Sequence, residues 1–222
     1  MFVKLSHNLS KNDPGWPGFP TYDYTPLTQI SKGDVAYTYS ITLFNHFGTH
    51  FDAPKHYNDE GLRITKLPLD TFIYEKPLLL EIKKSYEEFV TPSDLEPYAD
   101  QLREADLLMI RSGFVSKRKE DPEGFAKRGP AFSADAAKYV MDNFKLKAIA
   151  VDWISLASYA YPDDGTLAHQ YLFGKYHDHY TCIIEDACFE EIVGKKIKRV
   201  YAFPLMLEDV DSAQVTVIAE VE

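Results

Sequence analysis

Short apolar runs, each long enough for only one strand, constrain the fold of this 222-residue chain more than any other feature. PLLLEI at 77–82 and LLMIR at 107–111 are mostly apolar at consecutive positions, which is typical of strands buried on both faces. The pattern returns at AIAVD (148–152), CIIED (182–186), VYAFPLML (200–207) and QVTVIAEV (214–221). These runs predict a series of buried strands.

The segment DVAYTYSITLF at 34–44 shows a strict alternation instead. Every second residue from Val35 to Leu43 is apolar and lies on one face, while small residues fill the other face. A weaker alternation at 2–6 predicts another short strand. The breakers in NDPGWPGFP at 12–20 predict a loop between these two strands.

Capping residues mark the helices, which are fewer than the strands. Thr91 followed by Pro92 predicts a helix over TPSDLEPYADQL, and Ser133 predicts one over SADAAKYVMDNF. A third, short helix is expected from about Leu167 to Phe173, just before a glycine that would end it.

Composition and charge narrow the class of protein. The formal net charge of −10 argues against nucleic acid or an anionic membrane as partner, because both attract basic surfaces. The sequence has no apolar run of ~18–20 residues and only two cysteines, so a cytoplasmic, reducing location is expected. The charged stretch at 116–130 is expected to be a surface loop. Residues 1–222 are therefore predicted to form one α/β or α+β domain.

The segment HFGTHFDAPKH at 46–56 concentrates histidines around an aspartate, and these groups suit zinc, manganese or iron. His46, His50, Asp52 and His56 are separated by even numbers of residues, so on a straight strand they would share a face. On such a strand, however, His46 and Asp52 would be ~20 Å apart. Ligands of one ion must all lie ~2 Å from it. The chain must therefore fold back, and Gly48 is the position expected to allow the bend because it lacks a Cβ.

The same segment resembles the H-x-G-T-H-x-D-x-P-x-H motif of the cyclase family of metal-dependent hydrolases, which includes bacterial kynurenine formamidases and isatin hydrolases. Weaker similarities run along nearly the whole chain, at LSHNL, WPGFP, LPLD, LLMIRSGF, AVDWISL and YAFPLML. The resemblance implies a single compact α/β domain of the swivelling β/β/α type, with a mixed, partly barrel-like sheet and few helices. It also implies a homodimer or larger homo-oligomer that acts on a small-molecule substrate.

Site residues follow from the resemblance by position. His46, His50 and Asp52 are similar to the metal ligands of the family, and Asp52 is able to bridge two ions. His56 is similar to the catalytic acid–base histidine. Alternatively, His56 is a further metal ligand in the same cluster.

A second ligand pair of the family, a histidine and a later glutamate, is most similar to His169 and Glu185. The gap between them is longer than usual, so His177 or His179 in the apparent insert KYHDHYT is an alternative ligand. Trp16 is similar to a tryptophan that lines the substrate pocket in the formamidases of the family. Alternatively, Trp16 only covers the edge of the core. The segment DVDSAQVTVIAEV departs from the family because it lacks the proline and arginine that often precede the last strand.

These ligands outnumber the four of a tetrahedral zinc, so the resemblance implies either one octahedral ion such as Mn²⁺ or two Zn or Mn ions that share Asp52. A bound water would be acidified towards a pKa of ~7, and His56 would move a proton from it to a leaving nitrogen. The expected function is hydrolysis of the C–N amide bond of a small aromatic formamide or cyclic amide. The alternatives are a hydrolase or lyase of this family acting on a non-aromatic lactone or hydroxy acid, and a non-catalytic binding module for a metal or small ligand.

Overall fold

One mixed sheet of nine strands forms the centre of the computed structural model, which describes residues 1–222. The strand order is β5-β12-β13-β4-β11-β10-β8-β6, and β1 pairs with β13. The strands are β1 (Phe2–Lys4), β4 (His50–Asp52), β5 (Ile73–Tyr74), β6 (Pro77–Glu81), β8 (Leu107–Arg111), β10 (Ala148–Val151), β11 (Cys182–Glu185), β12 (Ile197–Pro204) and β13 (Ser212–Val221). Each predicted apolar run therefore contains a strand.

The sheet has a parallel half and an antiparallel half that meet at β4. Strands β6, β8, β10 and β11 run parallel to one another, whereas β4 pairs antiparallel with β11 on one side and with β13 on the other. β12 and β6 are far apart in the strand order, yet they also approach each other. The sheet is therefore curled and partly barrel-like, as expected.

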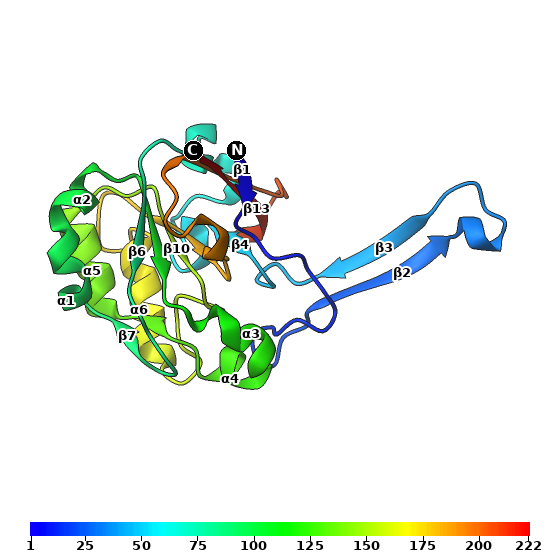
Figure 1. Ribbon diagram of the computed structural model, residues 1–222, viewed down its shortest axis with the longest axis horizontal. Coiled ribbons are helices and arrows are strands. Elements are labelled where there is room, and N and C mark those ends of the chain that lie inside the picture. The colour runs from blue at the N-terminus through cyan, green and yellow to red at the C-terminus, as the bar shows by residue number, and fades with distance from the viewer.

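Both faces of the parallel half are covered. On β8, Leu108 and Ile110 pack into a core shared with the helices, while Leu107 and Met109 pack into a second core with the antiparallel half. Figure 1 shows the helices gathered around β6 and β10, away from the chain ends. The helices are α1 (Pro92–Leu95), α2 (Ala99–Glu104), α3 (Lys117–Glu120), α4 (Pro122–Lys127), α5 (Ala134–Asn143) and α6 (Pro162–Leu172).

Two small sheets stand apart from the main one. β7 (Phe89–Val90) pairs with β9 (Ala131–Phe132), and β2 (Tyr22–Thr28) pairs with β3 (Thr38–Leu43). The β2–β3 hairpin projects from the body as a long arm (Figure 1). β3 confirms the alternating strand predicted within 34–44.

One loop prediction and two helix predictions need correction. The helix predicted over 91–102 is interrupted by a 3₁₀ turn at Glu96–Tyr98, because Pro97 within this turn cannot donate a backbone hydrogen bond. The stretch 116–130 is not a plain loop, since it holds α3 and α4 and buries Phe125 completely. Asp121 caps α4 by accepting a hydrogen bond from Gly124 N, and Pro122 occupies its first position.

The third predicted helix is longer than expected. α6 begins at Pro162 rather than near Leu167, again with a proline at the first helical position. The helix over 133–144 is confirmed as α5, with the Ser133 side chain accepting a hydrogen bond from Ala136 N.

Both cysteines are free, and no helix has the length and apolar character needed to cross a membrane. The cytoplasmic location stays a prediction.

Gly165 lets α6 pack closely against the loop that follows β10. A Cβ at this position would lie 2.3 Å from the Cβ of Ala157 and 3.1 Å from its Cα. Alanine has a higher helix propensity than glycine by about 1 kcal/mol, so an exposed helical site would gain stability from the change. At position 165 the close contact outweighs this gain, because neither the helix nor the loop backbone can move without disturbing the core.

We expect Gly165→Ala to lower the free energy of unfolding by about 1–3 kcal/mol, the usual range for overpacking. Leu167→Ala, at an exposed position of the same helix, is the matched control and should change stability little. Urea denaturation at fixed protein and metal concentration measures both variants. A Gly165→Ala protein as stable as wild type would show that the contact with Ala157 relaxes freely.

Candidate metal centre

Strand β4 places His50 and Asp52 on the same face of the sheet, because alternate residues of a strand point to the same side. Phe51 points to the other side and is completely buried. On the neighbouring strand β11, Glu185 lies directly opposite His50. His50 Nε2 is 3.2 Å from Glu185 Oε2 and 3.5 Å from Asp52 Oδ1. Three side chains from two strands therefore converge on one point.

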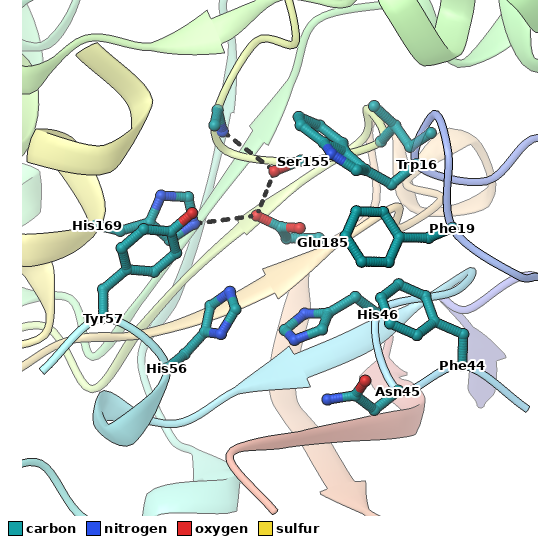
Figure 2. A pocket seen from close by; sticks show the side chains of 12 residues that line it. Trp16, Phe19, Phe44, Asn45, His46, His56, Tyr57, Ser155, His169 and Glu185 are labelled. Carbon is teal, nitrogen blue, oxygen red and sulfur yellow. Dashed lines mark hydrogen bonds and ion pairs between the residues drawn. The ribbon is translucent and has the colours of Figure 1, made fainter. Parts of the chain in front are cut away.

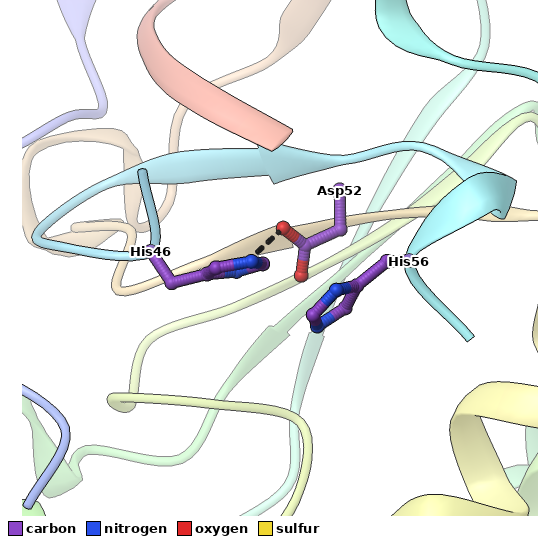
Figure 3. Close-up of side chains that lie close together, drawn as sticks. All are labelled: His46, Asp52 and His56. Atoms are coloured by element: carbon purple, nitrogen blue, oxygen red, sulfur yellow. Dashed lines mark ion pairs between the residues drawn. The ribbon is translucent and has the colours of Figure 1, made fainter. Parts of the chain in front are cut away.

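His46 reaches this point because the chain folds back at Gly48, as predicted. Gly48 has a φ of +66°, a left-handed conformation that a glycine adopts readily. His46 Nδ1 is 3.2 Å from Asp52 Oδ1. Figure 3 marks this ion pair with a dashed line. The turn is also held from β13, where the Gln214 amide donates hydrogen bonds to the carbonyls of Phe44, Asn45 and Phe47.

His169 comes from α6 and lies with its Nε2 3.5 Å from Glu185 Oε1. Its Nδ1 is 2.8 Å from the carbonyl of Gly165, and His50 Nδ1 is 2.8 Å from the carbonyl of Gly48. A carbonyl can only accept a hydrogen bond, so in both rings Nδ1 carries the proton. Nε2 of each ring is then free to act as a ligand, the orientation common in metal-bound histidines.

Unpartnered atoms at the centre of the cluster fit a cation. His50 Nε2 and both carboxylate oxygens of Asp52 are buried and have no hydrogen-bond partner. The contacts between these groups are short but are not hydrogen bonds, and the ligand atoms of His50, Asp52 and Glu185 lie within 4.8 Å of one another. Buried polar groups without partners are costly, and a divalent ion would satisfy them all.

Electrostatics also favours a positive ion here. Burial opposes the charged forms of His46 and Asp52, but their attraction dominates. The attraction between these two side chains, together with Asp211, raises the pKa of His46 to about 10. The same attraction, together with that of His50, lowers the pKa of Asp52. Burial opposes ionisation of Glu185, but its close contacts with His169 and His50 outweigh burial and hold its pKa well below the usual range. The carboxylates therefore stabilise positive charge, which a divalent ion would supply in place of protons.

His56 lies beside the cluster at the end of a 3₁₀ turn, Pro54–His56. Its Nδ1 is 2.6 Å from Asp211 Oδ2, and its ring centroid is 4.1 Å from that of His46. A carboxylate that accepts from Nδ1 leaves Nε2 of His56 without that proton. Burial opposes ionisation of Asp211, but the nearby His46 ring and the hydrogen bond from His56 outweigh burial and hold its pKa below the usual range.

The sequence analysis did not identify Asp211, Ser212 or Gln214 as site residues. They lie within the segment DVDSAQVTVIAEV, already noted as a departure from the family pattern, at and just before the start of β13. Asp211 is 155 positions from its partner His56, and no local spacing reveals such a contact. Ser155 was missed for the same reason. Its hydroxyl donates a hydrogen bond to Glu185 Oε1 and leaves Oε2 free.

A cavity of about 380 Å³ opens over the cluster, which is within the range of small-molecule sites. Figure 2 shows Trp16, Phe19 and Phe44 on one side and His56, Tyr57 and His169 on the other, with Glu185 and His46 between them. Trp16 lines this cavity, as the resemblance implied, and packs edge-on against Tyr159. The lining residues are Trp16, Phe19, Phe44, Asn45, His46, His56, Tyr57, Ile154, Ser155, Ala157, His169 and Glu185.

The two alternative ligands lie away from the cluster. His177 Nε2 is 3.0 Å from Asp142 Oδ1, and His179 Nδ1 is 3.0 Å from Asp178 Oδ1. Neither lines the cavity. The geometry therefore favours His169 as the histidine of the second ligand pair.

We expect the protein to carry one or two divalent ions per chain, and the ligand variants to lose them. His169→Ala and Glu185→Gln should lower metal content, because each removes a group that points to the cluster. His177→Ala and His179→Ala are matched controls and should retain it. Elemental analysis after removal of loose metal and reloading with Zn²⁺ or Mn²⁺ measures all five proteins. Wild-type protein with less than about a tenth of an ion per chain would contradict the assignment.

Comparison with known proteins identifies the family. Residues 3–158 match the model of the Cyclase family, described as putative cyclase. A kynurenine formamidase of Bacillus cereus is 26% identical over 217 residues, which cover 98% of this chain and 96% of that protein. An uncharacterized protein of Haemophilus influenzae is 38% identical over 108 residues, which cover 48% of this chain and 76% of that protein.

Solved structures show the same fold at low sequence identity. Isatin hydrolase A of Labrenzia aggregata, solved with benzyl benzoate, matches with a TM-score of 0.83 at 15% identity, over 99% of this chain and 93% of its own. This match confirms the fold that the resemblance implied. The chain belongs to the cyclase family of metal-dependent hydrolases, as the segment from His46 to His56 predicted.

Proposed function

We propose that this protein is a metal-dependent hydrolase that cleaves the C–N amide bond of a small aromatic formamide or cyclic amide. The observation that carries the proposal is a histidine, His56, paired with Asp211 beside a convergent ligand cluster at the floor of an aromatic cavity. A protein that only binds a metal would need the ligand cluster but not a histidine paired with a carboxylate beside it. The His56–Asp211 pair is a group of the kind that transfers protons in general acid–base catalysis.

The ligand cluster would hold one or two Zn or Mn ions. Two groups of side chains bring their ligand atoms within 4.8 Å of one another, His46 with Asp52 and His56, and His50 with Asp52 and Glu185. Asp52 is common to both, which supports a bridging role. When bound, the metal would supply Lewis-acid activation of water and of the amide carbonyl.

His56 is proposed as the acid–base residue. With its Nδ1 proton donated to Asp211, its Nε2 would accept a proton from the attacking water and return it to the leaving nitrogen. Asp211 would keep the ring in one tautomer and stabilise the positive charge that forms on it. The alternative is that His56 is itself a ligand, since it is close to His46 and Asp52.

The cavity supports an aromatic substrate. Trp16, Phe19, Phe44 and Tyr57 provide flat apolar surfaces, and no lysine or arginine is among the lining residues. This aromatic lining favours an aromatic amide over an aliphatic lactone or hydroxy acid, because flat apolar surfaces pack well against an aromatic ring. The relatives named kynurenine formamidase and isatin hydrolase support the same class.

A substrate panel tests the proposal. We expect Zn²⁺- or Mn²⁺-loaded protein to hydrolyse N-formylkynurenine or isatin faster than simple aliphatic lactones, as followed by absorbance or product chromatography. The metal-free protein is the control and should be inactive. Turnover confined to lactones would support the non-aromatic alternative, and metal-loaded protein inactive on the whole panel would count against the proposal.

Substitution at positions 56 and 52 separates proton transfer from metal binding. His56→Ala should keep the metal but lose turnover by roughly 10²–10⁴-fold, mainly in kcat, because proton transfer occurs in the transition state. Asp52→Ala should lose metal and activity together, and added Mn²⁺ or Zn²⁺ should restore part of its rate. Metal content measured beside rate distinguishes the two. Loss of metal from His56→Ala would make His56 a ligand.

Asp211 should act through His56 rather than on substrate. Asp211→Asn keeps the shape of the side chain but removes the charge that supports a positively charged ring. We expect metal content to be retained and kcat to fall by roughly 10–10²-fold, with little change in KM. Asp209→Asn, at an exposed position two residues earlier, is the matched control and should behave as wild type. Equal kcat in the two variants would remove Asp211 from the proposed mechanism.

A further inference from the structure

A buried arginine joins two carboxylates that are far apart in the sequence. Arg118 lies on α3 and is only 7% exposed. Its Nη1 is 3.0 Å from Asp13 Oδ1, and its Nη2 donates a hydrogen bond of 3.0 Å to Asp186 Oδ2. The Nε of the same guanidinium also donates to the Asp186 carboxylate. Arg118 therefore bridges the loop that follows β1 and the end of β11.

Asp186 belongs to the floor of the cavity, because it directly follows Glu185 at the end of β11. Its φ is +50°, a left-handed conformation that is uncommon outside glycine and needs support from its surroundings. The Arg118 guanidinium binds its side chain, and the Thr49 hydroxyl donates a hydrogen bond to its carbonyl. Thr49 directly precedes His50. This end of the bridge is therefore fixed beside two of the proposed metal ligands.

Asp13 belongs to the segment that forms one aromatic wall of the cavity. We call residues 9–20 the wall loop, because Trp16 and Phe19 both line the cavity from it. Phe19 stacks on Phe44, with ring centroids 4.9 Å apart. Figure 1 shows the segment between β1 and β2, in blue, beside α3. The other end of the bridge is therefore close to the aromatic side chains that would meet a substrate.

Few other polar contacts fix the wall loop. Its backbone forms hydrogen bonds only within the loop, and its three prolines have no N–H to donate. Lys11 pairs with Asp23, but Asp23 belongs to the projecting β2–β3 arm. The Asp13–Arg118 ion pair is therefore the only hydrogen bond or ion pair between the wall loop and the body that carries the metal ligands.

We propose that Arg118 is a positioning residue, which holds the wall loop against the metal-bearing floor and thereby sets the affinity for an aromatic substrate. The inference rests on the proposed function, because it takes the cavity as the substrate site. A guanidinium suits this task, since its nitrogens form a rigid fork. Nε and Nη2 bind Asp186 while Nη1 remains for Asp13. A lysine ammonium is a single point charge and cannot hold both carboxylates in this way.

Charge balance decides which substitution is informative. Removal of Arg118 would leave two carboxylates without compensation, and Asp186 is almost completely buried, so that variant would lose stability for a reason unrelated to the wall loop. Asp13→Ala instead leaves Arg118 and Asp186 as a balanced pair. The other bond that Asp13 accepts, from Ser10 N, is exposed, so water replaces it. Asp13→Ala therefore releases the wall loop and leaves the floor intact.

Acrylamide quenching of tryptophan fluorescence in the metal-loaded protein tests the proposal without reference to activity. The chain has two tryptophans, and Trp153 is completely buried, so the quencher reports mainly on Trp16. Asp13→Ala should raise the quenching constant by roughly half or more, because a loop with few fixed contacts opens more often. Trp16→Phe supplies the background from Trp153. Asp100→Ala, which removes an exposed ion pair on α2, is the matched control. An unchanged quenching constant in Asp13→Ala would overturn the proposal.

Kinetics show whether the bridge acts on substrate affinity. Asp13→Ala should raise KM for an aromatic amide roughly 2–10-fold, the effect of weakening one aromatic contact, while kcat and metal content stay unchanged. Arg118→Lys keeps the charge but not the fork and should raise KM in the same way. The double variant should add nothing, because both substitutions remove one contact. An unchanged KM, additive effects or a fall confined to kcat would contradict the positioning role. Wild-type protein inactive on every substrate would count against the proposed function, and quenching would still decide how the wall loop is held.

Discussion

The site depends on the position of one three-residue strand, β4, between two antiparallel neighbours. Because β4 pairs with β11 on one side and β13 on the other, His50 is aligned with both Glu185 and Gln214. A shift of one residue in the pairing of β4 with its neighbours would point His50 and Asp52 into the core on the other face of the sheet and would point Phe51 at the cavity. Complete burial of Phe51 opposes that shift, so hydrophobic packing on one face fixes the polar arrangement on the other.

Negative charge is the second constraint. Asp52 and Glu185 are almost completely buried, and Asp211 lies beside them at the start of β13. Burial of carboxylates is unfavourable unless positive charge compensates them, and the three histidines do so only as protonated groups. A metal at this point would be coupled to folding, because its ligands come from β4, β11, α6 and the turn before β4. The close packing of Gly165 on Ala157 matters here, since it sets how near α6 brings His169.

The cavity and the β2–β3 arm meet at the residues that directly follow β3. Phe44 lines the cavity and directly follows β3, and Gln214 binds the carbonyls of Phe44 and Asn45 at the point where arm and body join. In the family pattern a proline often stands in this last segment, and the sequence departs from it here. The structure shows what Gln214 does instead: a side-chain amide holds the turn that carries His46.

Local patterns determined much of this protein. Apolar runs located the strands, Ser133 located α5, and the spacing of His46, Gly48 and Asp52 required a reversal that Gly48 makes. These predictions succeeded because each depends on neighbours in the chain. The predicted loop at 116–130 failed because burial of Phe125 outweighs local polarity, and the early start of α6 at Pro162 was overlooked. The tertiary structure alone decided that Asp211 meets His56, that Ser155 holds Glu185, and that the apolar face of β3 is left uncovered. Contacts over such separations arise from strand order and register, which are set by how the whole core packs and leave no periodicity in the sequence.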